Sequence, residues 1–130
     1  EIGGLAGIST VVDGVTDWAR CRDAVRAVLA EGTMRLVAVH FPEGAICLTA
    51  DGQLFEEASV PVAPEWIGST VGAGDAFAAG MLYGLHEGWT VPTSLRLAHA
   101  VAASSLRSLT TVGSVADVDT CLEMAGLARP

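Results

Sequence analysis

The stretch from Ser69 to Phe77 reads STVGAGDAF, and it decides how the rest of the chain is interpreted. Gly72 and Gly74 lack a Cβ atom, so the backbone N–H groups of this turn can point into one concavity. A helical pattern begins directly behind the turn. The unpaired N–H groups and the dipole of a helix N-terminus favour a negative charge. The pattern therefore predicts a turn that binds anions, above all phosphate.

Asp75 is the candidate catalytic residue of this turn. A carboxylate beside a phosphoryl group can accept the proton of the hydroxyl that attacks it. The structural alternative is that Gly72 and Gly74 only begin a helix and that Asp75 only caps it. The short pattern Gly-x-Gly-Asp does not separate the two interpretations, so the longer context has to decide.

The longer string STVGAGDAFAAG, followed by a second helical segment with AHA at 98–100, resembles the C-terminal signature of the ribokinase-like (PfkB) carbohydrate kinases. The resemblance implies an α/β fold, namely the C-terminal portion of a ribokinase-like layered α/β/α fold. It also implies ATP-dependent phosphoryl transfer to a hydroxyl of a sugar or related small molecule. In that reaction Asp75 would be the base, and Gly72, Ala73 and Gly74 would form the anion hole.

Other residues match the family pattern with less specificity. The resemblance implies that Glu1 helps to organise the Mg²⁺ shell, and Mg²⁺ needs few protein carboxylates because it keeps several waters. It implies that Gly44 lies beside the nucleotide and that His99 borders the adenine pocket. Gly113 and Ser114 would belong to the loop that closes that pocket. Ordinary structural roles stay open for Gly44 and His99.

Three positions depart from the family pattern. His40 and Pro42 replace the usual Thr and Gly at the strand-to-turn segment, and Pro42 has no N–H to donate. Ser69 replaces an aspartate that contributes to a monovalent-cation site in many relatives, so we expect weak or absent K⁺ activation. These departures leave an alternative open, in which the protein is a catalytically degraded homologue that binds a nucleotide or a partner.

The composition suggests that part of the protein lies outside this chain. Of the 130 residues, 51% are hydrophobic and only 17% are charged, which is apolar for a small domain that must solvate its own surface. The chain begins with Glu1 rather than Met. We therefore expect residues 1–130 to be the nucleotide-binding part of a kinase whose substrate-binding half and lid lie upstream, inactive on its own. A self-associating dimerisation module is the alternative.

Charge and cysteine usage narrow the function classes. The net charge is −8 and the chain has no lysine, which argues against nucleic acid as a partner. No apolar run approaches the roughly 18–20 residues that span a bilayer. The three cysteines lack metal-binding spacing, which favours reduced, buried thiols in a cytoplasmic protein. The expected partners are a small-molecule substrate (a sugar or nucleoside) and, through elements outside this chain, a second copy in a homodimer.

Hydrophobic periodicity and turn residues predict the secondary structure. The first ten residues are expected to form a loop. Two glycines inside the helix that follows the anion turn, Gly80 and Gly84, predict close approach of another backbone, because glycine costs about 1 kcal/mol relative to alanine in a helix. The expected elements are helices over 17–31, 74–87, 92–109 and 117–125, strands over 36–41, 45–49, 53–56 and 59–62, and a loop over 110–114.

Overall fold

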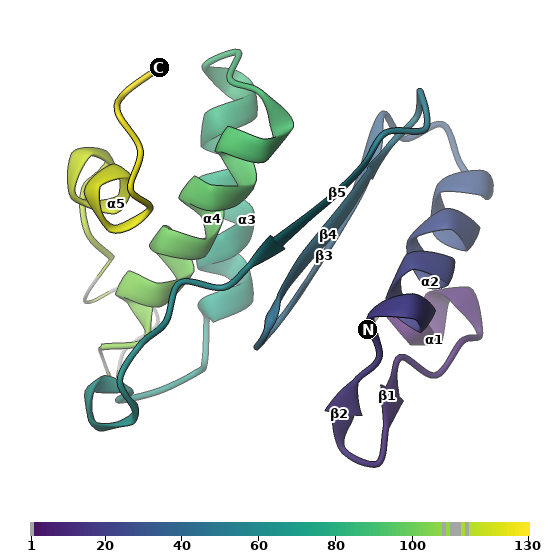
Figure 1. Cartoon of the computed structure of the whole chain (residues 1–130), viewed down its shortest axis with the longest axis horizontal. Coiled ribbons are helices and arrows are strands. Elements are labelled where there is room, and N and C mark those ends of the chain that lie inside the picture. The colour runs from purple at the N-terminus through teal and green to yellow at the C-terminus, as the bar shows by residue number, and fades with distance from the viewer. Residues whose placement is uncertain (1, 108, 110–112, 114) are drawn as a thin grey trace. The chain divides into compact units, whose positions relative to one another are not determined.

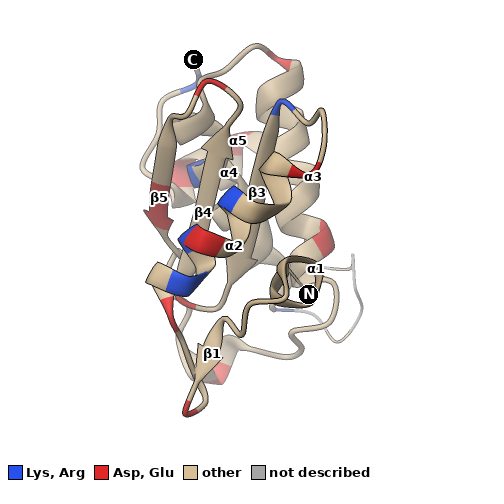
Figure 2. Ribbon diagram, turned by 90° about the vertical axis from the view of Figure 1, so that its right-hand side faces the viewer, with Lys and Arg blue, Asp and Glu red and all other residues tan. Residues whose placement is uncertain are grey.

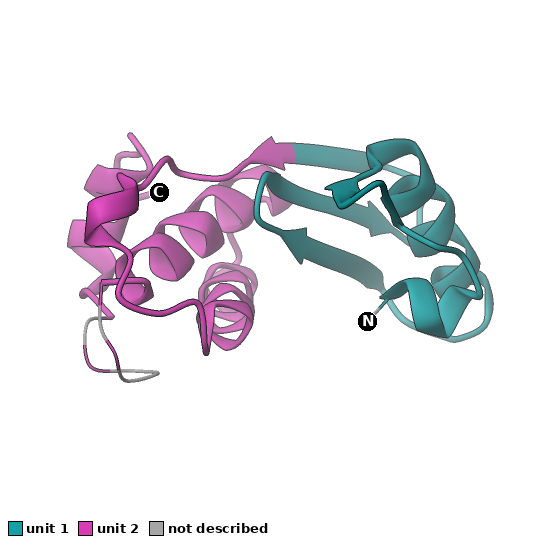
Figure 3. Ribbon diagram, turned by 90° about the horizontal axis from the view of Figure 1, so that it is seen from below, with its two compact units in different colours: residues 1–56 teal, residues 57–130 magenta. Residues whose placement is uncertain are grey.

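The structure is a computed structural model that describes residues 2–107, 109, 113 and 115–130. The chain forms two compact units, residues 1–56 and residues 57–130 (Figure 3). The first unit combines helices with strands, and the described residues of the second are helical apart from loops and the end of one strand. The order of elements is that of an α/β protein, as the sequence predicts.

A helix packed on a β-hairpin forms the core of the first unit (Figure 1). Helix α2 (Trp18–Ala30) begins where the Asp17 side chain accepts a hydrogen bond from the Arg20 amide, which confirms the predicted helix start. Strands β3 (Leu36–Phe41) and β4 (Gly44–Thr49) pair antiparallel, with Phe41 opposite Gly44. The ring of Trp18 meets the ring of Phe41 edge to face at 4.8 Å, which joins the helix to the sheet.

Strand β5 (Leu54–Ala58) completes a three-stranded sheet of order β3-β4-β5. An ion pair ties it to α2: the guanidinium of Arg22 donates two hydrogen bonds to the carboxylate of Glu56, one of them 3.0 Å long. Figure 2 shows basic residues on α2 and acidic residues on β5. The Arg22 guanidinium holds the pKa of the Glu56 carboxyl below its usual range, because it hydrogen-bonds the charged form.

The first ten residues correct a prediction. The sequence predicts a loop there, but Ile2–Ala6 forms the short helix α1. A small hairpin to which the sequence analysis assigned no element follows, made of β1 (Val11–Val12) and β2 (Val15–Thr16). Its turn residues Asp13 and Gly14 have φ values of 51° and 81°, the left-handed conformation that a two-residue hairpin turn needs.

The second unit is built on two long helices, α3 (Ala73–His86) and α4 (Val91–Ser105). A Cβ atom on Gly80 would lie 2.8 Å from the Cα atom of Ala98, and one on Gly84 would lie 3.0 Å from the Cα atom of Ser94. The expectation that these glycines admit a neighbouring backbone is therefore confirmed. Helix α5 (Val118–Met124), capped by Asp117, packs its Cys121 and Leu122 into the same core.

Two predicted elements of this unit differ in the structure. Helix α4 ends at Ser105 rather than near Leu109, which is 85% exposed. The hydroxyl groups of Ser104 and Ser105 bond back to carbonyls one turn earlier, at 2.8 and 2.7 Å, and so compete with the helical ladder. The predicted strand over 59–62 is not formed, because Pro61 cannot donate to a ladder; β5 instead continues to Ala58. The predicted loop over 110–114 lies mostly outside the described residues.

Among the residues that the structure describes, no helix combines the length and the apolar character needed to cross a bilayer.

The helix contact at Gly80 gives a first prediction. In Gly80→Ala the new methyl group collides with the backbone of Ala98, which no side-chain rotation relieves, so we expect about 1–3 kcal/mol of lost stability in urea unfolding. The matched control is Gly4→Ala, another helical glycine whose Cβ would meet nothing within 4 Å. That change should be neutral or slightly stabilising. Equal effects of the two variants would contradict the close approach.

The Arg22–Glu56 pair gives a pH prediction. A depressed folded-state pKa means that the pair stabilises the protein above the ordinary glutamate pKa and that this contribution is lost as the pH falls through the folded-state value. Both side chains are partly exposed to solvent, which screens the pair, so its contribution is small. Glu56→Gln should lower the unfolding free energy at neutral pH, and its deficit against wild type should shrink on acidification. Glu123→Gln, an exposed acid with no ion pair among the described residues, should show no such trend.

Candidate functional site: a turn at the N-terminus of a helix

The turn that precedes α3 has the backbone conformation that only glycine adopts easily. Gly72 is the N-terminal cap of the helix and has φ of +86°, in the left-handed region. Gly74 lies in the first turn of the helix, where a Cβ atom would meet nothing within 4 Å. The first glycine therefore shapes the turn, and the second leaves open space directly in front of the helix.

The amide groups of this turn are only partly used inside the protein. The Ala73 N–H donates to the Thr70 carbonyl, at a long distance of 3.3 Å. The carbonyl of Gly72 accepts the first helical bond from Ala76 at 2.9 Å. The amides of Gly72 and Gly74 have no acceptor among the described residues. Two N–H donors at the positive end of a helix dipole are therefore available to an anion.

Asp75 lies beside these amides in the first turn of α3, and it is exposed. Its carboxylate forms no hydrogen bond and no ion pair with any described residue. The structural alternative made this residue a cap of the helix. The cap is Gly72, however, and no side chain of the described residues caps this helix end. The carboxylate of Asp75 is therefore accessible to a molecule that binds at the turn.

The turn is anchored to the far end of α4. The amides of Gly68 and Ser69 both donate to the carbonyl of Leu106, at 2.8 and 3.3 Å. The hydroxyl oxygen of Ser69 accepts a hydrogen bond from the Val71 amide at 3.1 Å, so it serves the turn itself. The anchor was missed by the sequence interpretation, because nothing in the local pattern relates Leu106 to a glycine so far away in the chain.

His99 lies in the interface between α3 and α4. The residue is 2% exposed, and its ring meets the ring of Phe77 edge to face, with the centroids 5.2 Å apart. This position gives the imidazole a packing role in the second unit, the ordinary structural role left open above. Its assignment to the adenine pocket stays a prediction.

The remaining predicted site residues are spread over the chain. Gly44 is the buried first residue of β4, in the first unit, opposite Phe41 of the adjoining strand. Gly113 is exposed in the second unit. Glu1 and Ser114 lie outside the described residues, so the roles assigned to them stay predictions. The structure therefore brings together Gly72, Ala73, Gly74 and Asp75, and it adds their anchor on α4.

Titratable groups near the hairpin β3–β4 have pKa values shifted by burial. Burial lowers the pKa of His40, which therefore stays neutral at physiological pH. Burial raises the pKa of the Cys47 thiol to about 11, so this cysteine is a weak nucleophile. All three cysteines are buried and free, as the sequence predicts. No group of three or more His, Cys, Asp or Glu residues able to hold a metal ion occurs in the described ranges.

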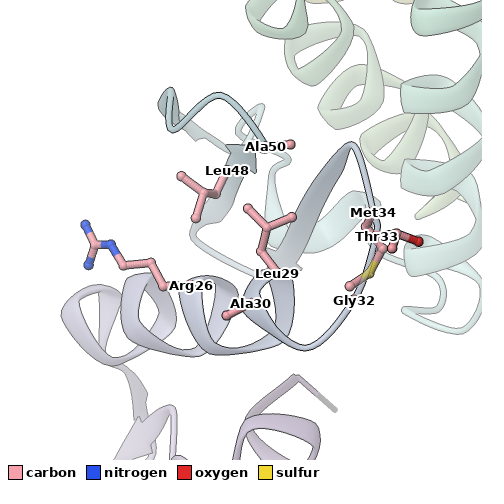
Figure 4. Close-up of a pocket in the computed structure, with 8 residues that line it drawn as sticks. All are labelled: Arg26, Leu29, Ala30, Gly32, Thr33, Met34, Leu48 and Ala50. Carbon is pink, nitrogen blue, oxygen red and sulfur yellow. The ribbon is translucent and has the colours of Figure 1, made fainter.

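The first unit contains an open cavity of about 500 Å³ (Figure 4). It lies between the C-terminal end of α2, the segment that follows it, and β4. Its lining is mostly apolar, and one lining residue is charged. The residues are Arg26, Leu29, Ala30, Gly32, Thr33, Met34, Leu48 and Ala50. None of them belongs to the predicted site.

Comparison with known proteins agrees with the motif. The sequence pattern of the family described as pfkB family carbohydrate kinase matches residues 1–117. The 5-dehydro-2-deoxygluconokinase of Geobacillus thermodenitrificans is 36% identical over 73 residues, which are 56% of this chain and 21% of that protein. The ATP-dependent 6-phosphofructokinase of Thermoanaerobacterium thermosaccharolyticum is 42% identical over 60 residues, which are 46% of this chain and 19% of that protein. The chain thus spans about a fifth of the length of these relatives.

Solved structures show the same fold. Phosphofructokinase-2 from Escherichia coli in complex with potassium superimposes with a TM-score of 0.76 at 20% identity, over 97% of this chain and 38% of that one. Arabidopsis thaliana ribokinase complexed with ribose and ATP gives a TM-score of 0.75 at 20% identity, over 98% of this chain and 38% of that one. The predicted fold class is confirmed: the chain has the α/β fold of a portion of a ribokinase-like kinase.

Proposed function

The chain belongs to the PfkB family of carbohydrate kinases, and on this basis we propose that it carries the phosphoryl-transfer site of an ATP-dependent sugar kinase. The acceptor is a hydroxyl of a sugar or a related small molecule. One observation carries the proposal: two open amides, those of Gly72 and Gly74, lie at the N-terminus of α3 beside the exposed, unpartnered carboxylate of Asp75.

The arrangement suits the charge changes of phosphoryl transfer. Asp75 accepts the proton of the sugar hydroxyl, which becomes the attacking oxygen, and the bond between the γ-phosphorus and the bridging oxygen of ATP breaks. The amides of Gly72 and Gly74 donate hydrogen bonds to oxygens of the γ-phosphoryl group, and the dipole of α3 adds positive potential there. In a chain without lysine and with a net charge of −8, backbone N–H groups are a suitable source of this potential.

The wider nucleotide site includes residues that the family pattern assigns. We propose Gly44, His99, Gly113 and Ser114 as neighbours of ATP. The open amides of Gly72 and Gly74 can donate hydrogen bonds to a phosphate group, so these residues suit the phosphates of ATP. Mg²⁺ supplies charge neutralisation on the phosphate oxygens when it is bound, and Glu1 is the residue proposed to organise its water shell.

Residues 1–130 are proposed as the nucleotide-binding, C-terminal part of the kinase domain. The chain spans 38% of the two solved structures compared above and about a fifth of the curated relatives. The sugar-binding half and its lid would then be supplied by the remainder of the protein, and this chain alone would be inactive. An E. coli phosphofructokinase-2 has been solved as an inhibited tetramer. We propose that this protein also binds a second copy of itself, in a homodimer, through elements outside this chain.

A second candidate function is a degraded homologue that binds nucleotide without transferring phosphate. It is favoured by Ser69, which is neutral, and by Pro42, which has no N–H at the turn between β3 and β4. The sequence Gly-Ala-Gly-Asp at 72–75 is intact, and Asp75 is accessible beside the two open amides, which favours the active kinase. Phosphorylation of any sugar by the intact protein with ATP and Mg²⁺ separates the two functions.

Asp75 supplies the central prediction. Asp75→Asn in the intact protein keeps the size of the side chain but removes the base, so turnover should fall about 100-fold or more while ATP still binds. Turnover is measured with a panel of sugars and nucleosides, and ATP binding is measured by calorimetry.

The matched control for that experiment is Glu87→Gln, which neutralises an exposed acid at the opposite end of α3. It should leave both turnover and ATP binding close to wild type. Unchanged turnover in Asp75→Asn would remove the catalytic assignment, and loss of ATP binding in that variant would indicate a structural role instead.

Ser69 supplies a prediction about monovalent cations. A phosphofructokinase-2 was solved in complex with potassium. Here the Ser69 side chain is uncharged and its oxygen already accepts the Val71 amide, so it is a poor ligand for a hard cation. Replacing Na⁺ by K⁺ at constant ionic strength should change turnover by less than about twofold. Strong K⁺ activation would contradict this prediction, and Ser69→Asp should increase the K⁺ response.

A further inference from the structure

Trp66 and Arg107 form an exposed stack beside the anion turn. The guanidinium carbon of Arg107 lies 5.0 Å from the centroid of the Trp66 ring, within the range of a cation–π interaction. Trp66 ends the short 3₁₀ helix over Pro64–Trp66, and Arg107 directly follows the C-terminal cap of α4. Trp66 is 57% exposed, so the hydrophobic core does not hold its indole in place.

The residues of the stack are close neighbours in the chain of the residues whose hydrogen bonds anchor the turn. Two and three residues after Trp66, the amides of Gly68 and Ser69 donate to the carbonyl of Leu106, the residue immediately before Arg107. The ring contact and the two backbone hydrogen bonds therefore hold together the same two segments, residues 66–69 and the C-terminal end of α4. Gly72 follows Ser69 by only three residues, so we expect movement of these two segments against each other to displace the open amides.

Among the described residues, the side chain of Arg107 interacts with the indole of Trp66. The other arginines of the second unit have acidic partners: Arg96 approaches Glu57 at 4.0 Å, and Arg129 approaches Asp119 at 3.5 Å. Arg107 forms no ion pair with any described residue. A guanidinium stacks on an aromatic face better than an ammonium does, because it is planar and weakly hydrated.

Trp66 is in turn held by its own backbone. Pro64 begins the 3₁₀ helix, the Trp66 amide donates to the Ala63 carbonyl at 2.9 Å, and the Ile67 amide donates to the Pro64 carbonyl at 3.2 Å. The turn thus presents the indole from a constrained backbone to the end of α4. The ring contact with Arg107 therefore acts on the backbone segment that leads directly into Gly68 and Ser69.

We propose that Trp66 and Arg107 are positioning residues that hold the anion turn in its binding conformation. They act through the amides of Gly68 and Ser69 and do not touch the ligand. Only the expected effect on turnover rests on the proposed phosphoryl-transfer function. The expected effect on the conformation of the turn does not depend on activity.

The first test measures the turn without using activity. Amide hydrogen exchange is followed by NMR in the intact protein at Gly68 and Ser69. Trp66→Leu removes the ring but keeps apolar bulk, and Arg107→Met removes the charge but keeps the length. In each variant, exchange at both amides should accelerate about two- to fivefold, the range for an exposed cation–π pair. Because the two side chains act together, the double variant should be no faster than the faster single variant.

Conservative variants and a charge control sharpen this test. Trp66→Phe and Arg107→Lys keep a ring and a cation, so they should retain most of the protection. Arg129→Met removes one exposed positive charge elsewhere in the second unit and should leave exchange at Gly68 and Ser69 unchanged. Unchanged exchange in both Trp66→Leu and Arg107→Met, or fully additive effects in the double variant, would overturn the proposal.

The second test uses turnover with ATP and the best sugar of the panel. The variants that loosen the turn should lower kcat/KM for ATP by about two- to fivefold and leave the KM of the sugar unchanged, while the conservative variants recover it. A loss above about 100-fold in Arg107→Met, with Trp66→Leu near wild type, would mean that Arg107 touches the substrate, and the positioning proposal would fall.

The two tests separate the proposals. If the wild-type protein phosphorylates nothing but exchange responds as expected, the proposed function fails and the role of the stack in holding the turn stands. If the wild-type protein is an active kinase and neither exchange nor kcat/KM responds, the function stands and the positioning proposal fails.

Discussion

The second unit depends on one contact, the approach of α3 and α4 at Gly80 and Gly84. A Cβ atom at either glycine would collide with the backbone of the opposite helix, so the two helices approach this closely because both positions lack a side chain. The helices are antiparallel neighbours in sequence, which places the N-terminus of α3 and the C-terminus of α4 at the same end (Figure 1). The Leu106 carbonyl can therefore receive the two amides that anchor the anion turn.

The proposed site uses the backbone as its source of positive potential. The chain has no lysine, and in the second unit Arg96 and Arg129 face acids while Arg107 faces Trp66. None of these is needed at the phosphate if the N–H groups of Gly72 and Gly74 bind it. Such donors are fixed in position, so they require little reorganisation when charge develops. How precisely these N–H groups are placed depends on how firmly the anchored residues before them, Gly68 and Ser69, are held.

Much of the fold follows from local patterns in the sequence. The caps Asp17 and Asp117 and the turn glycines mark the ends of helices that the structure confirms. Two differences from the predicted elements have local causes: Asp13–Gly14 is a hairpin signal, and Pro61 excludes the strand predicted over 59–62. The early end of α4 is different, because it depends on serine hydroxyls that turn back to the helix and on bonds to a distant loop.

The residues around Gly72 were enough to indicate the family, the α/β class and a glycine turn at a helix N-terminus, because a glycine with positive φ, its neighbours and a helix start are all encoded within a few positions. That this turn binds an anion stays a proposal. The packing of His99 against Phe77 and the fastening of the turn to Leu106 became visible only in the folded chain. These contacts join residues that are far apart in the chain. Their existence depends on how closely two helices pack, and no short pattern contains that distance.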